Sequence, residues 1–237
     1  MSPTAGAGRR RASRSRTGWS LPTWLALGSC VLYVLLTLLV VTGATQALDE
    51  AVLHRLRPGD AWNDPQVRWS PWMSRLRPSR TYLLLAVTSV VVSLWRRSWW
   101  PSFLGLALAG VSGVVALATK VAVHRPDPHG YVTESGGAYP SGHTVALVVC
   151  LSGCLLVCWP RVRWWLWAPV LAATALLTTA LLVAGAHWLT DVVGGLLLAF
   201  AVVAGCSRTA LRRKAHRQPP RTGEDARPPS DTAVIDR

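Results

Sequence analysis

The sequence predicts an all-α membrane protein, a polytopic bundle of six transmembrane helices. The chain is 51% hydrophobic and only 15% charged. Its apolar residues are grouped in runs, most of them near the roughly 20 residues that a helix needs to cross a bilayer, and longer than a soluble core requires. The predicted spans are Trp24–Gly43, Thr81–Trp95, Ser98–Thr119, His143–Trp159, Trp164–Ala186 and Trp188–Cys206.

The arginines predict how this bundle is oriented in the membrane. An even number of spans places both ends of the chain on one side, and both ends are rich in positive charge, which favours the cytoplasm. Two short loops that would face the same side carry Arg96–Arg97 and Arg161–Arg163, with tryptophans beside them as in an interfacial aromatic belt. The clusters consist of Arg9, Arg10, Arg11, Arg14 and Arg16 in one tail and of Arg208, Arg212, Arg213, Lys214, Arg217 and Arg221 in the other.

The net charge of +14 comes largely from these tails, 1–20 and 207–237, whose Arg, Pro, Ser and Thr content predicts disordered cytoplasmic segments. Positive clusters next to a membrane attract anionic lipids. No base-reading module accompanies them, so we expect membrane lipids and not nucleic acid as partners. The sequence does not identify protein partners. Between the tails it divides into a first span with its loop, 21–80, and a main membrane domain, 81–206.

The first span and the loop after it have competing interpretations. An arginine-rich start and small residues near Ala47 are typical of a signal peptide. The apolar stretch of about 20 residues exceeds the usual range of about 7–15, which favours an uncleaved anchor. The loop Leu48–Arg80 would lie outside although it carries six arginines. Its prolines and tryptophans fit a segment lying on the membrane surface, and a solvated loop fits as well.

Three separated segments bring polar side chains to one predicted level of the membrane, on the extracytoplasmic side. Few other reactive groups occur outside the tails and the first loop, so this convergence requires an explanation. The residues are Lys120 at the end of the third span, Arg125 in the loop after it, Ser141, Gly142 and His143 at the start of the fourth, and His187 and Asp191 at the start of the sixth.

Asp191 and His187 form the first candidate pair. They are four residues apart, so on a helix they would share a face. Asp191 is the only acid within or bordering the second to sixth spans, where an ionisable residue is costly. A carboxylate that accepts the Nδ1–H of an imidazole leaves Nε2 free as a nucleophile or base. A structural His–Asp pair between helices explains the spacing equally well.

The turn Pro140–Ser141–Gly142–His143 predicts an anion pocket. Ser141 is a good N-cap, Gly142 lets a backbone amide approach an anion, and the first amides carry the positive end of the helix dipole. His143 would donate a proton there. Lys120, one of only two lysines, would add a compact charge that suits phosphate. Each feature alone also fits a capped helix or a snorkelling lysine, but together they favour a functional site.

These residues resemble the motifs of the type 2 phosphatidic acid phosphatase superfamily, which also contains the vanadium-dependent haloperoxidases. The similarity consists of Lys120, then "PSGH" at 140–143, then His187 and Asp191 in an HxxxD pattern, and it covers roughly 81–206. It implies a phosphatase-like membrane domain with His187, His143 and Asp191 as catalytic residues. It further implies phosphate binding by Lys120, Ser141 and Gly142, with help from Arg125.

Two arginine positions of the family are not matched. Its first motif places Arg-Pro after a lysine and six residues, where this chain has Asp127 and Pro128; Arg125–Pro126 comes two residues early. Its third motif begins with Ser-Arg, where this chain has Ala180 and Leu181. A charge-assisted hydrogen bond contributes about 1.5–3 kcal/mol, so the loss of two would slow the reaction considerably. If the family geometry persists, Asp127→Arg would raise activity.

The resemblance implies hydrolysis of a lipid phosphomonoester or diphosphate through a phosphohistidine, without a metal or other cofactor. Phosphatidate, phosphatidylglycerol phosphate and polyprenyl diphosphate all fit. A catalytically weak relative that binds lipid phosphates or acts as a scaffold is the alternative, and the membrane spans disfavour a vanadate-dependent oxidase. We expect an integral protein of a bacterial plasma membrane, with both termini cytoplasmic and the site facing outward.

Overall fold

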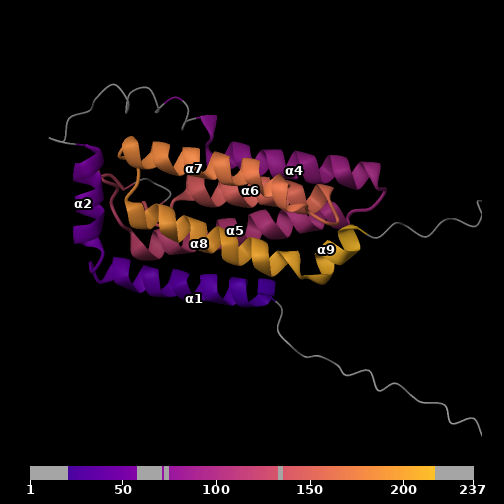
Figure 1. The fold of residues 1–237 in the computed structure, drawn as a ribbon, viewed down its shortest axis with the longest axis horizontal. Helices are drawn as coiled ribbons and strands as arrows, with labels where there is room; N and C mark the ends of the chain where they lie inside the picture. Colours follow the sequence, from indigo (N-terminus) through magenta and orange to yellow (C-terminus); the bar gives the residue numbers. More distant parts are fainter. Residues whose placement is uncertain (1–20, 58–70, 72–74, 133–135, 217–237) are drawn as a thin grey trace, which may run out of the picture.

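The computed structural model describes residues 21–57, 71, 75–132 and 136–216. The predictions for the two tails and for much of the first loop therefore lie outside the described residues. The described chain forms long helices that run side by side (Figure 1). They are α1 (Leu21–Val41), α2 (Gln46–Leu56), α4 (Pro78–Trp95), α5 (Trp100–Val123), α6 (Gly142–Cys158), a short 3-10 helix (Trp164–Leu166), α7 (Trp167–Val183), α8 (Leu189–Ser207) and α9 (Ala210–Ala215).

Each of the predicted spans is a helix, so the all-α membrane fold is confirmed. By length and composition, α1, α4, α5, α8 and α7 with its preceding 3-10 turn are apolar enough to cross a membrane. The remaining helix, α6, which corresponds to the fourth predicted span, is shorter at 17 residues. The second predicted span, which was short, begins earlier in the structure, at Pro78, because proline at the first helical position loses no hydrogen bond.

Helix α6 lies at the centre of the bundle, in contact with α4, α5, α7 and α8. Every residue from Thr144 to Cys150 is buried, as expected for a helix that is apolar on all sides. The outer helices instead present large apolar side chains outward: Leu83 is 62% exposed and Leu106 is 68% exposed. An apolar surface of this kind is stable in contact with lipid, which agrees with an integral membrane protein.

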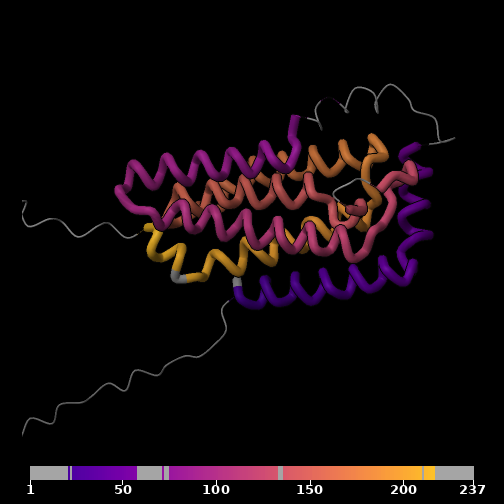
Figure 2. The backbone as a smooth tube through the Cα atoms, turned by 180° about the vertical axis from the view of Figure 1, so that it is seen from behind, coloured from indigo at the N-terminus to yellow at the C-terminus, as the bar shows by residue number. Residues whose placement is uncertain are grey.

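Helix α2 differs from both interpretations of the first loop. It lies across one end of the bundle, where α7 ends and α8 begins (Figures 1 and 2). Its acidic residue Asp49 is only 1% exposed, so this part of the loop packs into the protein. A solvated or surface-bound segment would keep such a carboxylate in water.

The two ends of the described chain, the start of α1 and the end of α9, lie together at the end of the bundle opposite α2 (Figures 1 and 2). This arrangement is the one expected from an even number of spans. It separates α9, with its basic residues, from the end of the molecule that carries the predicted site residues.

Candidate active site

Lys120 lies in the last turn of α5, where a cation is favoured by the negative end of the helix dipole. Its Nζ donates hydrogen bonds to the carbonyl oxygens of Gly137 at 2.7 Å and Ala138 at 3.3 Å. The backbone N–H of Gly137 in turn donates to the Lys120 carbonyl at 3.1 Å. The loop before α6 is therefore folded back onto the end of α5.

Helix α6 begins as the sequence predicts. Ser141 is its N-cap, and its Oγ accepts hydrogen bonds from the Thr144 backbone N–H at 3.4 Å and the Thr144 hydroxyl at 3.1 Å. A Cβ added to Gly142 would lie 3.6 Å from Cε of Lys120. The lysine and the first amides of α6 are thus neighbours, as the predicted anion pocket requires.

His187 and Asp191 are in contact, but they do not share a helix. His187 lies in the turn before α8, which begins at Leu189, and Asp191 belongs to the first turn of α8. The Asp191 Oδ2 approaches His187 Nδ1 at 3.4 Å and accepts the Trp188 backbone N–H at 3.0 Å. The prediction that both lie on one helix is wrong: the acid reaches back as part of a capping box.

His143 faces His187 from the other side of the site. Their ring centroids are 6.2 Å apart, with an angle of 67° between the ring planes. Two imidazoles, a lysine and the N-terminus of α6 therefore meet at one end of the bundle, although they come from three separate segments.

Arg125, which was expected to help bind phosphate, instead contacts two carboxylates. Its NH1 donates to Asp191 Oδ1 at 3.0 Å and to the Thr190 hydroxyl at 2.8 Å, while NH2 donates to Asp49 Oδ2 at 2.7 Å. The side chain of Asp49 is fully buried. Asp49 was not predicted as a site residue. It belongs to the first loop, where an acid close after the first span is the only sequence feature that points to it.

The two unmatched family positions bring no cation to the site. Asp127 Oδ1 accepts the backbone N–H groups of His129 and Tyr131, both at 2.9 Å, and so closes its own loop. Leu181 is fully buried beside Leu147 and Leu177.

Arg57, at the end of α2, provides positive charge nearby. Only 4% exposed, it lies beside Gly185, where a Cβ would be 3.0 Å from NH1 of Arg57 and 3.4 Å from Cε1 of His129. Burial is the main cause that lowers the pKa of His129; Asp127 opposes this shift, and Arg57 adds to it. His129 is therefore neutral at neutral pH.

Tyr139 anchors the loop before α6 against α1. Its hydroxyl lies 2.9 Å from the Thr37 hydroxyl, and its ring stacks on Tyr33 with centroids 6.2 Å apart. Burial raises the pKa of Tyr139 to about 12, so the phenol stays neutral. The loop that carries the anion-binding turn is thereby held from two sides, by α5 and by α1.

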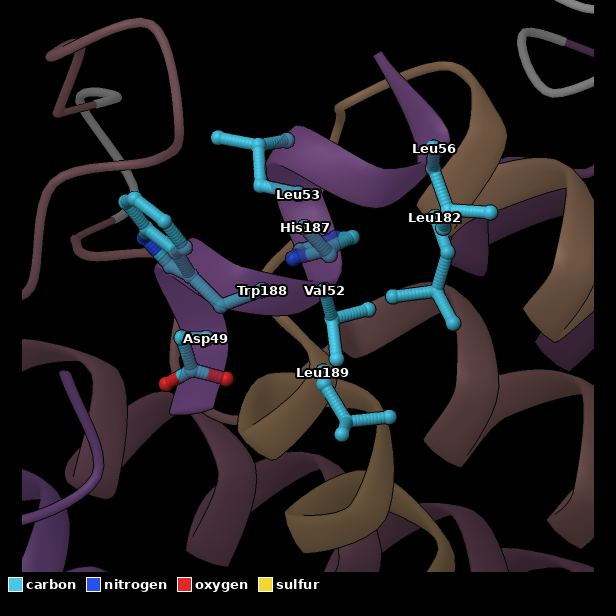
Figure 3. A pocket seen from close by; sticks show the side chains of 8 residues that line it. All are labelled: Asp49, Val52, Leu53, Leu56, Leu182, His187, Trp188 and Leu189. Atoms are coloured by element: carbon cyan, nitrogen blue, oxygen red, sulfur yellow. The ribbon is translucent and has the colours of Figure 1, made fainter. Parts of the chain in front are cut away.

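Figure 3 shows a pocket beside His187, between α2 and the junction of α7 with α8. Apart from Asp49 and His187, its lining is apolar: Val52, Leu53, Leu56, Leu182, Trp188 and Leu189. These side chains pack closely beside His187 and cover it on the side of α2. Within the described ranges, no three His, Cys, Asp or Glu residues are placed so that they could hold a metal ion.

Comparisons with known proteins agree with the fold. The chain is similar in structure to the crystal structure of the first transmembrane PAP2 type phosphatidylglycerolphosphate phosphatase from Bacillus subtilis, with a TM-score of 0.66 and 17% identity. The match covers 77% of this chain and 94% of the other. No curated protein matches the sequence. The family model of the PAP2 superfamily matches residues 27–215, and the chain belongs to this superfamily.

Proposed function

We propose that this protein is a membrane lipid phosphatase that hydrolyses a lipid phosphomonoester or diphosphate through a phosphohistidine on His187. The observation that carries the proposal is the meeting of His187, backed by Asp191, with His143 across a gap of 6.2 Å between ring centroids. A nucleophile with its orienting acid on one side and a proton donor on the other is the arrangement that group transfer needs.

The first step transfers the phosphoryl group to the enzyme. Asp191 Oδ2 accepts the Nδ1–H of His187, so the lone pair of Nε2 attacks phosphorus. The bond between phosphorus and the leaving oxygen breaks, and His143 donates a proton to that oxygen. The product is a phosphohistidine and a lipid alcohol or lipid monophosphate.

The phosphoryl oxygens are held by Lys120, Ser141 and the backbone N–H of Gly142. Two of the three Nζ hydrogens of Lys120 go to loop carbonyls, which leaves the third for a phosphate. The start of α6 adds the positive end of its dipole. Arg125 was expected to assist, and its role is taken up in the next subsection.

The second step releases phosphate. His143, now neutral, accepts a proton from a water molecule, whose oxygen attacks the phosphorus of the phosphohistidine. The bond between phosphorus and His187 Nε2 breaks, and His187 regains its starting state. Preorganised positive charge around the spread negative charge lowers both barriers.

The substrate is a lipid phosphate whose head group reaches the site from the membrane. Membership of the PAP2 superfamily and the similarity to a transmembrane phosphatidylglycerolphosphate phosphatase support this class. Phosphatidate, phosphatidylglycerol phosphate and polyprenyl diphosphate remain the candidates. The site would face outward from a bacterial plasma membrane, opposite the cytoplasmic tails.

Phosphate release from a panel of these lipids in detergent, with EDTA present, tests the proposal. The wild type should release phosphate, and His187→Ala should lower the rate by about 1,000-fold or more, because losing a nucleophile abolishes the covalent route. His54→Ala removes an exposed histidine from α2 and is the matched control, with an unchanged rate expected. Equal rates for wild type and His187→Ala would exclude the mechanism, and a metal requirement would count against it.

The alternative function is lipid phosphate binding without turnover. Asp127 and Leu181, which stand at the two unmatched arginine positions, are the observations that favour it. It predicts saturable binding of lipid phosphate by the wild type, with no phosphate released in the same assay.

A further inference from the structure

We propose that Asp49 and Arg125 are positioning residues that hold Asp191, and through it His187, in the orientation for attack. This inference deepens the proposed function and rests on it. It assigns a role to α2, the helix across the end of the bundle, and gives Arg125 a task other than gripping phosphate.

The residues form one continuous chain of polar contacts. Asp49 Oδ2 lies 2.7 Å from Arg125 NH2, and Arg125 NH1 lies 3.0 Å from Asp191 Oδ1. The other oxygen of Asp191, Oδ2, faces His187 Nδ1 at 3.4 Å. Asp191 therefore uses one oxygen for the arginine and the other for the imidazole, so the arginine fixes the rotation of its carboxylate.

Burial makes this chain restrictive. The side chains of Asp49 and Asp191 are fully buried, and that of Arg125 is 14% exposed. Buried carboxylates require charge-assisted partners, and a planar guanidinium binds two of them with fixed geometry. Two negative charges stand on either side of one positive charge, so removing any member leaves the others without balance.

Asp49 also holds the first turn of α8 directly. Its Oδ1 accepts the Thr190 backbone N–H at 2.9 Å, and its Oδ2 accepts the Thr190 hydroxyl at 2.6 Å. Thr190 immediately precedes Asp191, so α2 grips the acid by two routes, through the arginine and through the backbone. This double support is what a precisely oriented site needs.

The surroundings of Arg125 favour positioning over phosphate binding. Both NH1 hydrogens are used by Thr190 and Asp191, and one NH2 hydrogen is used by Asp49. The guanidinium carbon lies 5.1 Å from the centroid of the Trp188 ring, whose Nε1–H donates to the Pro126 carbonyl at 2.9 Å. With two carboxylates beside it, Arg125 offers a phosphate little net charge.

The kinetic constants for phosphate release distinguish these roles. Asp49→Asn and Arg125→Gln should each lower kcat by about 10- to 100-fold, because a nucleophile displaced by about 1 Å loses this much. KM should stay within about twofold, since the phosphate ligands are untouched. The double variant should be no slower than the slower single variant, because both residues act through Asp191.

Glu50→Gln is the matched control, since Glu50 is the next residue of α2 and its carboxylate pairs with Gln46 at 2.8 Å, within the same helix. It should keep wild-type kcat and KM. Should Asp49→Asn fail to fold, Thr190→Val, which removes the hydroxyl bonded to both Asp49 and Arg125, should still lower kcat. The proposal is overturned if Asp49→Asn matches the wild type, or if Arg125→Gln raises KM at unchanged kcat.

A second readout does not depend on turnover. NMR of protein with isotope-labelled histidine reports which ring nitrogen of His187 carries the hydrogen. In the wild type it should be Nδ1, whereas Asp49→Asn should show a mixture of the two tautomers. If the wild type hydrolyses no lipid phosphate but this tautomer changes, the proposed function fails and the positioning role stands. If hydrolysis depends on His187 but Asp49→Asn changes neither the tautomer nor kcat, the proposed function stands and the positioning role fails.

Discussion

At the scale of single residues, the carboxylates of this protein are distinguished by their partners. Asp191 divides its oxygens between an imidazole and a guanidinium, whereas Oδ1 of Asp127 accepts two backbone N–H groups of its own loop. These bonds tie the Asp127 carboxylate to its own loop. Asp127 therefore has a structural role at the position where the family has an arginine.

This arrangement changes the expectation for Asp127→Arg. The substitution removes the acceptor for the N–H groups of His129 and Tyr131 and adds a cation that has to leave the turn. We expect kcat/KM at or below the wild-type value in the lipid phosphate assay. Asp127→Asn keeps an acceptor oxygen and should match the wild type. A tenfold or greater gain for Asp127→Arg would mean that position 127 does reach the phosphate.

The predictability of the site also differs from residue to residue. Lys120, the Ser141–His143 turn and the His187–Asp191 pair could be predicted, because each depends on spacing within a short motif. The contact between Arg125 and Asp49 joins residues 76 positions apart, and no local pattern encodes such a pairing. The family resemblance assigned Arg125 to phosphate because it considered the residue type without its partners.

At the scale of helices, the site depends on close approach between α6 and α8. Gly195 of α8 lies against the turn that begins α6: an added Cβ would be 2.9 Å from the Ser141 carbonyl oxygen and 3.0 Å from Thr144 Cβ. Small residues allow helices in membranes to approach this closely. A methyl group at this position would push the anion-binding turn away from His187.

Gly195→Ala should therefore reduce both stability and activity. Overpacking of this kind costs about 1–3 kcal/mol, which a thermal melt in detergent would detect as a lower Tm. Gly205→Ala is the control in the same helix, since nothing lies within 4 Å of its added Cβ. Equal Tm and kcat for the two variants would show that the contact at Gly195 is unimportant.

Helix α2 shows where prediction of elements from the sequence reached its limit. The six spans were predictable because the thickness of a bilayer fixes their length and composition. The 11 residues of α2 lack such a signal, and an isolated helix of this length is marginal in water. Its stability comes from contacts with α7 and α8, which only the folded molecule provides.

At the scale of the whole molecule, the two ends of the bundle have different chemistry. One end carries α2 and the paired histidines, and the other carries both ends of the described chain with α9 and its basic residues (Figure 1). From the positive-inside bias we expect the basic end to lie in the cytoplasm. The site would then face outward, as the sequence predicts.

Cysteine labelling in intact cells tests this orientation. In a variant without the native cysteines, Glu50→Cys marks the end with α2, and Arg161→Cys marks the loop between α6 and α7. A membrane-impermeant maleimide should label Glu50→Cys in intact cells and Arg161→Cys only after permeabilisation. The reverse pattern would place the site on the cytoplasmic side.

The position of Asp49 also bears on where the working unit of this protein starts. A shortened chain from Thr81 onward would keep every recognisable motif, yet Arg125 would lose the counter-charge that α2 supplies, and α8 would lose α1 as its neighbour. The motifs therefore cover a shorter part of the chain than the part that is proposed to orient His187. Any attempt to transfer the motifs to another membrane scaffold would therefore have to carry α1 and α2 with them.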